Sequence, residues 1–171
     1  MGVTKPQDIL VALKLALTDG KSASFATLAK SVGMSASEVY ASCSRLSEAR
    51  LLMPDSLMVR RKPLIDFLIH GVPYAFPAGQ GEMTRGMPTA WAAPVMAGKL
   101  VFNEAEAPVW PDPEGTRKGL AVQPLYRSAP VAAKNDPSLY ELLALVDALR
   151  LGRARERSMA TKQIEERLSH A

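Results

Sequence analysis

The sequence predicts an α+β protein that is mostly helical, because two kinds of pattern divide the chain. Apolar residues recur at helical spacing in residues 1–70 and again from residue 137 onwards, whereas ten of the 13 prolines and seven of the 11 glycines lie in residues 71–137. Proline removes backbone donors and glycine costs conformational entropy in regular elements. We therefore expect a helical N-terminal domain (1–70), a Pro/Gly-rich irregular region of short strands and turns (71–136), and C-terminal helices (137–171).

Composition supports a globular protein with a hydrophobic core. The 171 residues correspond to about one domain. Hydrophobic residues make up 47% and charged residues 22% of the chain, which excludes a mostly disordered protein. The net charge of +4 permits a polyanionic partner without requiring one.

Several functional classes are not expected. The apolar stretch 9–17 contains Lys14 and is shorter than the roughly 18 residues of a membrane span, and residues 1–7 lack a secretory signal, so we expect a cytoplasmic protein that does not contact membranes. Cys43 is the only cysteine, and with His70 and His170 it falls short of a four-ligand zinc site. No metal and no other cofactor is expected.

The first zone predicts two helices that precede a tight turn. Pro6 suits the first turn of the first helix and Gly20 its end. A second helix is expected over residues 24–31, with its end at Gly33. The apolar face of the first helix consists of Ile9, Leu10, Leu13, Ala16 and Leu17.

A third helix is expected over residues 35–49. The segment 35–38, Ser-Ala-Ser-Glu, is a capping box, in which Ser35 and Glu38 satisfy each other's backbone amides. Val39, Cys43 and Leu46 follow at spacings of four and three and form the buried stripe. The outward face is short and polar, with Ser37, Tyr40, Ala41 and Ser44 on it and Arg45 at its edge.

A hairpin is expected next, with strands 51–53 and 57–60 around the turn 54–56. Its end carries three basic residues, Arg60, Arg61 and Lys62. Pro63 then opens a further helix over residues 64–70.

This order of elements resembles the winged helix-turn-helix domain of prokaryotic transcriptional regulators, over about residues 5–62. Ala29, Gly33 and Val39 match the alanine, glycine and aliphatic positions of the helix-turn-helix pattern, and the run 35–52 is similar to regulators of the MarR and Rrf2 type. Arg50 stands where that pattern commonly has glycine, so the turn into the hairpin is expected to differ.

The resemblance implies sequence-specific binding of double-stranded DNA by a transcriptional regulator, with repression as the expected mode. Hydroxyl and methyl groups can contact base edges in the major groove, and basic side chains can neutralise phosphates. A homodimer is expected, since one short recognition helix covers only a few base pairs. The candidate DNA-binding residues are Ser35, Ser37, Tyr40, Ala41, Ser44, Arg45, Arg60, Arg61 and Lys62.

One alternative stays open: an antitoxin-like or accessory subunit could use the same fold to bind a protein, with the Pro-rich region holding the partner. An enzyme is not expected, because Cys43 lies on a buried helix face and no other catalytic pattern is present. The aromatic residues of the middle region are interpreted as its small core, with a ligand or peptide pocket as the alternative; they are Tyr74, Phe76, Trp91, Trp110 and Tyr126.

The C-terminal region predicts a helix that Asp136 caps and Pro137 opens. We expect the helices of this region either to pair subunits or to pack on the first domain. Arg150, Arg153 and Arg157 share one face, as phosphate ligands or as partners in ordinary helix ion pairs.

Replacing Ser35 with alanine should lower the free energy of unfolding by about 1 kcal/mol, because an amide at the start of the third helix loses its acceptor. Urea denaturation measures the difference. Unchanged stability would show that this helix begins elsewhere.

Overall fold

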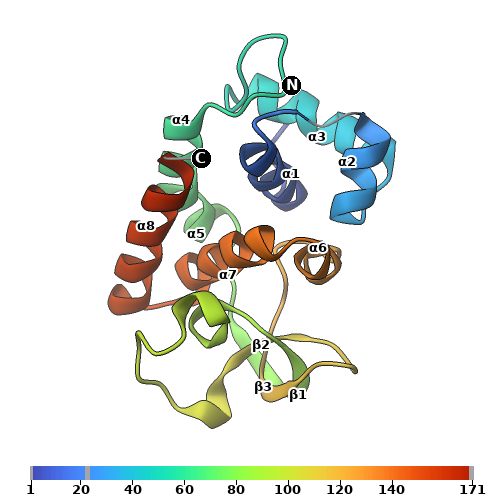
Figure 1. The fold of residues 1–171 in the computed structure, drawn as a ribbon. Coiled ribbons are helices and arrows are strands. Elements are labelled where there is room, and N and C mark those ends of the chain that lie inside the picture. The colour runs from blue at the N-terminus through green and yellow to red at the C-terminus, as the bar shows by residue number, and fades with distance from the viewer. Residues whose placement is uncertain (1, 22–23, 170–171) are drawn as a thin grey trace.

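The computed structural model describes residues 2–21 and 24–169 and has an α+β fold, with many helices and a small sheet of three strands at one end (Figure 1). This confirms the predicted class. The helices are α1 (Pro6–Thr18), α2 (Phe25–Val32), α3 (Ala36–Glu48), α4 (Arg61–His70), α5 (Val72–Ala75), α6 (Ala129–Asn135), α7 (Pro137–Leu151) and α8 (Ala154–Ser169). The strands are β1 (Gln80–Pro88), β2 (Pro108–Pro111) and β3 (Arg117–Val122), and the 3₁₀ helices are η1 (Ala90–Ala92), η2 (Pro94–Met96) and η3 (Glu104–Glu106).

The sequence signals around α2 and α3 are confirmed. Gly33 ends α2 in the left-handed conformation, with a φ of 69° that favours glycine. At the start of α3 the Ser35 hydroxyl accepts a hydrogen bond from the Glu38 amide at 3.2 Å, and the Glu38 carboxylate accepts one from the Ser35 amide at 2.8 Å. The short turn between these caps fixes the direction in which α3 leaves α2.

The turn after α3 forms without glycine. Arg50 itself adopts the left-handed conformation, with a φ of 61°, and the Leu51 amide donates to the Leu46 carbonyl at 2.9 Å. This pair of features is typical of a helix C-terminus of the Schellman type. Arg50 therefore replaces the glycine of the pattern and still adopts the left-handed backbone conformation at this turn.

The predicted hairpin is smaller than expected. Its two segments form one isolated bridge, between Leu52 and Val59, and the Met53 amide donates to the Met58 carbonyl at 2.8 Å. The helix after it begins at Arg61, three residues earlier than predicted. Pro63 is the third residue of α4, where an amide has no partner within the helix, so proline does not delay the start.

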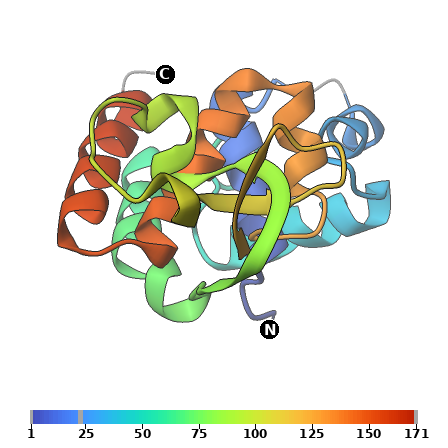
Figure 2. The same ribbon diagram turned by 90° about the horizontal axis from the view of Figure 1, so that it is seen from below.

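The middle region holds the three strands. Strand β1 pairs antiparallel with β2 and β3, and β2 pairs parallel with β3, so the three strands close on one another. A Cβ atom on Gly86 of β1 would lie 2.0 Å from the Trp110 carbonyl oxygen, so this close approach requires glycine. Seen from below, the strands lie across the helices (Figure 2).

The same region also contains α6, which the prediction of strands and turns missed. Pro130 occupies the first turn of α6, a place where the missing amide costs no hydrogen bond. High proline content therefore marked a helix start here rather than its absence.

Helix α7 lies at the centre of the protein. Nine of its residues are buried, and it packs against α1, α4, α5, α6 and α8. Of the two arrangements expected for the C-terminal helices, the structure shows packing on the N-terminal helices, and one hydrophobic core includes residues from all three predicted regions. His170 lies outside the described residues.

The cap of α7 gives stability a pH dependence. Asp136 accepts hydrogen bonds from the amides of Ser138 and Leu139 and pairs with Lys14 of α1 at 2.8 Å. Burial acts to raise the pKa of Asp136, but Lys14 and these two amides outweigh it and hold the pKa below its ordinary value.

Asp136→Asn should therefore be less stable than the wild type near pH 7. A lowered carboxyl pKa adds stability above the pKa of the unfolded chain, about 4, and that stability is lost as the pH falls through the folded pKa. Urea denaturation should show that the difference in free energy of unfolding between the two proteins is smaller at pH 3 than at pH 7. A difference independent of pH would contradict this role of the charge.

Candidate nucleic-acid interface

Helix α3 presents the predicted polar face to solvent. Ser35, Ser37, Tyr40 and Ser44 are exposed, and Ala41 is half-buried. Tyr40 has 63% of its surface exposed, and its ring makes an edge-to-face contact with Phe25 of α2 at 5.5 Å between centroids. The side chains on this face can therefore meet a partner without a rearrangement of the helix.

The opposite stripe of α3 is buried as predicted, and it includes Cys43. Burial and the nearby Asp8 carboxylate raise the pKa of the Cys43 thiol to about 11. The thiol therefore stays protonated near neutral pH and packs as a small apolar group.

The first turn of α3 is fixed by residues from a distant part of the chain. Beyond its bond to the Ser35 amide, the Glu38 carboxylate accepts a hydrogen bond from the Tyr126 hydroxyl at 3.1 Å and contacts Arg127 at 3.3 Å. The hydrogen bonds from Ser35 and Tyr126, with the charge of Arg127, lower the pKa of Glu38. The Ser35 hydroxyl serves the cap and shares a hydrogen bond with the Ser37 hydroxyl at 3.2 Å, which leaves Tyr40 and Ser44 as the more available polar groups.

Arg45 does not lie free at the edge of this face. Its guanidinium binds the Asp8 carboxylate through Nε at 2.8 Å and through a terminal nitrogen at 2.7 Å. Asp8, on α1, is fully buried and also accepts a hydrogen bond from the Lys5 amide. These donors join α1 to α3 within the chain, and the expected contact of Arg45 with DNA stays a prediction.

The three basic residues after the hairpin have separate roles. Arg61 donates to the carbonyls of Ala16 and Leu168 at 2.8 and 2.9 Å, near the ends of α1 and α8, and it pairs with Asp19. Arg61 therefore has a structural role within the chain, and its expected contact with a phosphate stays a prediction. Lys62 is exposed and pairs with Asp66 one turn further along α4.

Arg60 lies instead in a groove between the end of α3 and the hairpin. The groove has a volume of about 540 Å³ and is lined by Ser47, Arg50, Leu52, Met53, Pro54 and Arg60. The Arg60 guanidinium donates to the Arg50 carbonyl at 3.0 Å, and Arg50 also lines this groove at the end of α3. Sequence reasoning missed Ser47 and treated Arg50 only as a departure from the pattern, although both follow the outward positions of α3.

Residues 2–21 and 24–169 contain no group of three or more His, Cys, Asp and Glu side chains placed to hold a metal ion. Within the same residues, no helix has the length and apolar character needed to cross a membrane.

No protein-family model, curated protein or solved structure matches this chain.

Arg45→Ala should lower the free energy of unfolding by about 3 kcal/mol, because it leaves the buried Asp8 carboxylate without its partner. Asp8→Ala combined with Arg45→Ala should cost less than the sum of the two single changes. Denaturant unfolding of the four proteins measures this coupling. Additive losses would contradict the ion pair.

Proposed function

We propose that this protein binds double-stranded DNA as a transcriptional regulator, with residues 5–62 acting as a winged helix-turn-helix. In this assignment α3 is the recognition helix and the 51–60 hairpin is a short wing. The observation that carries the proposal is the exposed polar face of α3 beside a groove that holds Arg50 and Arg60. A helix with short polar side chains fits the major groove, and flanking guanidinium groups suit the phosphates on either side.

The residues divide into two roles. Tyr40 and Ser44 carry hydroxyl groups that can bond to base edges, and the Ala41 methyl can contact the methyl group of thymine. Arg50 and Arg60 suit the phosphate backbone, because contacts there position the protein without reading sequence. Specificity for DNA sequence is expected to be moderate, because one hydroxyl group can form hydrogen bonds with the edges of several different bases.

A homodimer belongs to this proposal as well. One copy of α3 can read only a few base pairs, and a two-fold arrangement doubles the number that is read. Because α7 is buried within a single chain, the dimer would use a surface other than that helix.

A second function is supported by the apolar residues near the same face. Met53 and Met58 on the hairpin are 46% and 53% exposed, and Tyr40 is 63% exposed. Methionine and tyrosine are enriched at protein interfaces. The face would then bind a protein, as an antitoxin-like or accessory subunit does.

Variants of the residues proposed for base contacts and for phosphate contacts distinguish DNA binding from protein binding. Tyr40→Ala with Ser44→Ala should reduce the preference for the cognate site while retaining binding to random duplex DNA, since each good base contact contributes about 1 to 3 kcal/mol of discrimination. Arg50→Ala with Arg60→Ala should weaken binding to all sequences alike. Competition binding with labelled duplexes measures both effects.

The matched control is Arg155→Ala with Lys162→Ala, which removes two exposed positive charges from α8. Binding by this control should equal that of the wild type. If the α3 variant keeps its full preference, or if the wild type has none, the proposal fails and the protein-binding function takes its place.

A further inference from the structure

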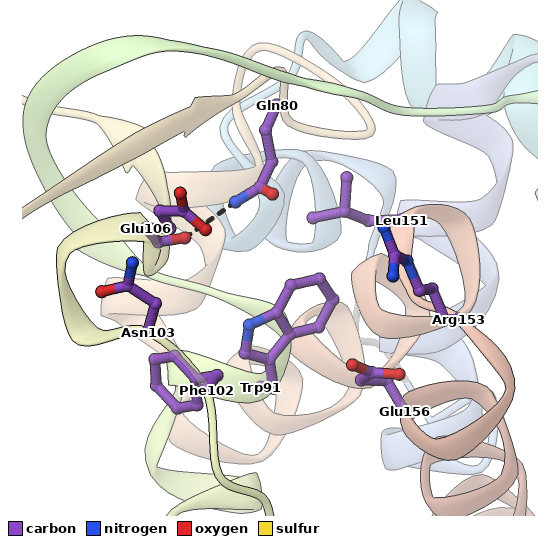
Figure 3. Close-up of a pocket in the computed structure, with 8 residues that line it drawn as sticks. All are labelled: Gln80, Trp91, Phe102, Asn103, Glu106, Leu151, Arg153 and Glu156. Carbon is purple, nitrogen blue, oxygen red and sulfur yellow. Dashed lines mark hydrogen bonds between the residues drawn. The ribbon is translucent and has the colours of Figure 1, made fainter.

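A second candidate site lies at the other end of the molecule, where α7 turns into α8. Eight residues line this pocket, which has a volume of about 400 Å³ (Figure 3). They come from the start of β1, from η1, from the segment 102–106 and from the junction of α7 and α8: Gln80, Trp91, Phe102, Asn103, Glu106, Leu151, Arg153 and Glu156. We call it the Trp91 pocket.

Hydrogen bonds and a ring contact hold the walls of the Trp91 pocket. The Gln80 side-chain amide donates to the Glu106 carbonyl at 2.9 Å, which joins β1 to η3. The Asn103 side-chain oxygen accepts a hydrogen bond from the Ala105 amide, so its NH2 group remains as a donor. The Arg117 guanidinium, paired with Glu104, lies 5.8 Å from the centre of the Phe102 ring.

The charged groups of the pocket are not paired with one another. Within residues 2–21 and 24–169, Glu106, Arg153 and Glu156 have no ion-pair partner. Two carboxylates and one guanidinium give the lining a net negative charge, although the whole chain carries +4. In Figure 3 the Trp91 indole projects into the hollow, with Glu106 on one side and Glu156 on the other.

Aromatic faces together with carboxylates are the chemistry that recognises organic cations. The face of an indole ring attracts a cation more strongly than that of other aromatic side chains, and carboxylates add charge-assisted hydrogen bonds. A volume of about 400 Å³ is also within the range of small-molecule sites.

We propose that the Trp91 pocket binds a small organic cation, an amine or a guanidine, over the Trp91 ring and between the carboxylates of Glu106 and Glu156. The Asn103 NH2 group and Arg153 then meet acceptor groups on the rest of the ligand. The inference goes beyond DNA binding and does not rest on it, since the pocket shares no residue with the face of α3.

Agmatine, which carries an amine and a guanidine, is the probe, and glutarate is the anionic control. The two indole N–H signals in an NMR spectrum provide the readout, because Trp91 lines the pocket whereas the Trp110 indole is buried and donates to Asp147 at 2.7 Å. Trp91→Phe assigns the signals. Agmatine should shift the Trp91 signal saturably and leave that of Trp110 in place.

The variants test the carboxylates. Glu156→Gln should weaken agmatine binding by about two- to fivefold, as expected for the loss of one partly exposed ion pair, and adding Glu106→Gln should weaken it further. Glu165→Gln is the matched control, because it makes the same charge change at an exposed position of α8 outside the pocket.

The proposal is overturned if agmatine leaves the Trp91 signal unmoved, if glutarate binds as well as agmatine, or if Glu165→Gln weakens binding as much as Glu156→Gln. None of these outcomes affects the DNA proposal, which is tested at a different surface.

Discussion

The structure depends on one buried carboxylate, that of Asp147 in the middle of α7. It accepts hydrogen bonds from the Thr89 hydroxyl at 2.6 Å, from the Trp110 indole at 2.7 Å and from Arg150 at 2.8 Å. Arg150 also donates to the carbonyls of Phe76, which precedes β1 in the sequence, and of Gln123, which directly follows β3. Burial raises the pKa of Asp147, and Arg150 with the two other donors opposes this. The indole and the guanidinium can only donate, so the Asp147 carboxyl is the acceptor in both of these hydrogen bonds.

This network makes α7 the element that joins the two ends of the protein. On one side its polar residues bond to Trp110 of β2 and to the segments that precede β1 and follow β3, and on the other its apolar residues pack against α1 and α4. Two further arginines extend the same principle: Arg45 joins α1 to α3 through Asp8, and Arg61 joins α4 to the ends of α1 and α8. Each of these guanidinium groups has a carboxylate partner and at least one further acceptor, which offsets part of the cost of removing its charge from water. The polar face of α3 takes no part in this packing and stays exposed.

Local features of the fold were predictable from sequence, whereas distant partners were not. The caps of α3 and α7, the end of α2 at Gly33 and the burial of Cys43 all depend on residues within a few positions of one another, and each is confirmed. Helical spacing places Arg45 at the edge of the outward face of α3. It could not show that Asp8, 37 residues away in the sequence, lies beside Arg45.

The same limit applies to other charged and aromatic residues. Arg150, Arg153 and Arg157 were grouped as one face, yet Arg150 is buried with Asp147, Arg153 lines the Trp91 pocket and Arg157 lies over the Tyr74 ring. Of the aromatic residues assigned to a small core, Trp110 is fully buried, whereas Tyr74 is 74% exposed. Spacing along one helix predicts the direction of a side chain, but it does not predict which distant segment of the chain packs against that side chain.

The most direct test of the account is a salt titration of the wild-type protein with random duplex DNA and with the duplex upstream of its own coding sequence. Phosphate contacts release bound counterions, so the logarithm of the binding constant should fall linearly with the logarithm of the salt concentration, by about 0.9 for each phosphate neutralised. With Arg50 and Arg60 on phosphates in each copy of a dimer, the account predicts a negative slope with a magnitude of about 3 or more. It also predicts tighter binding to the upstream duplex than to random DNA. A slope near zero, or no binding at low salt, would contradict it.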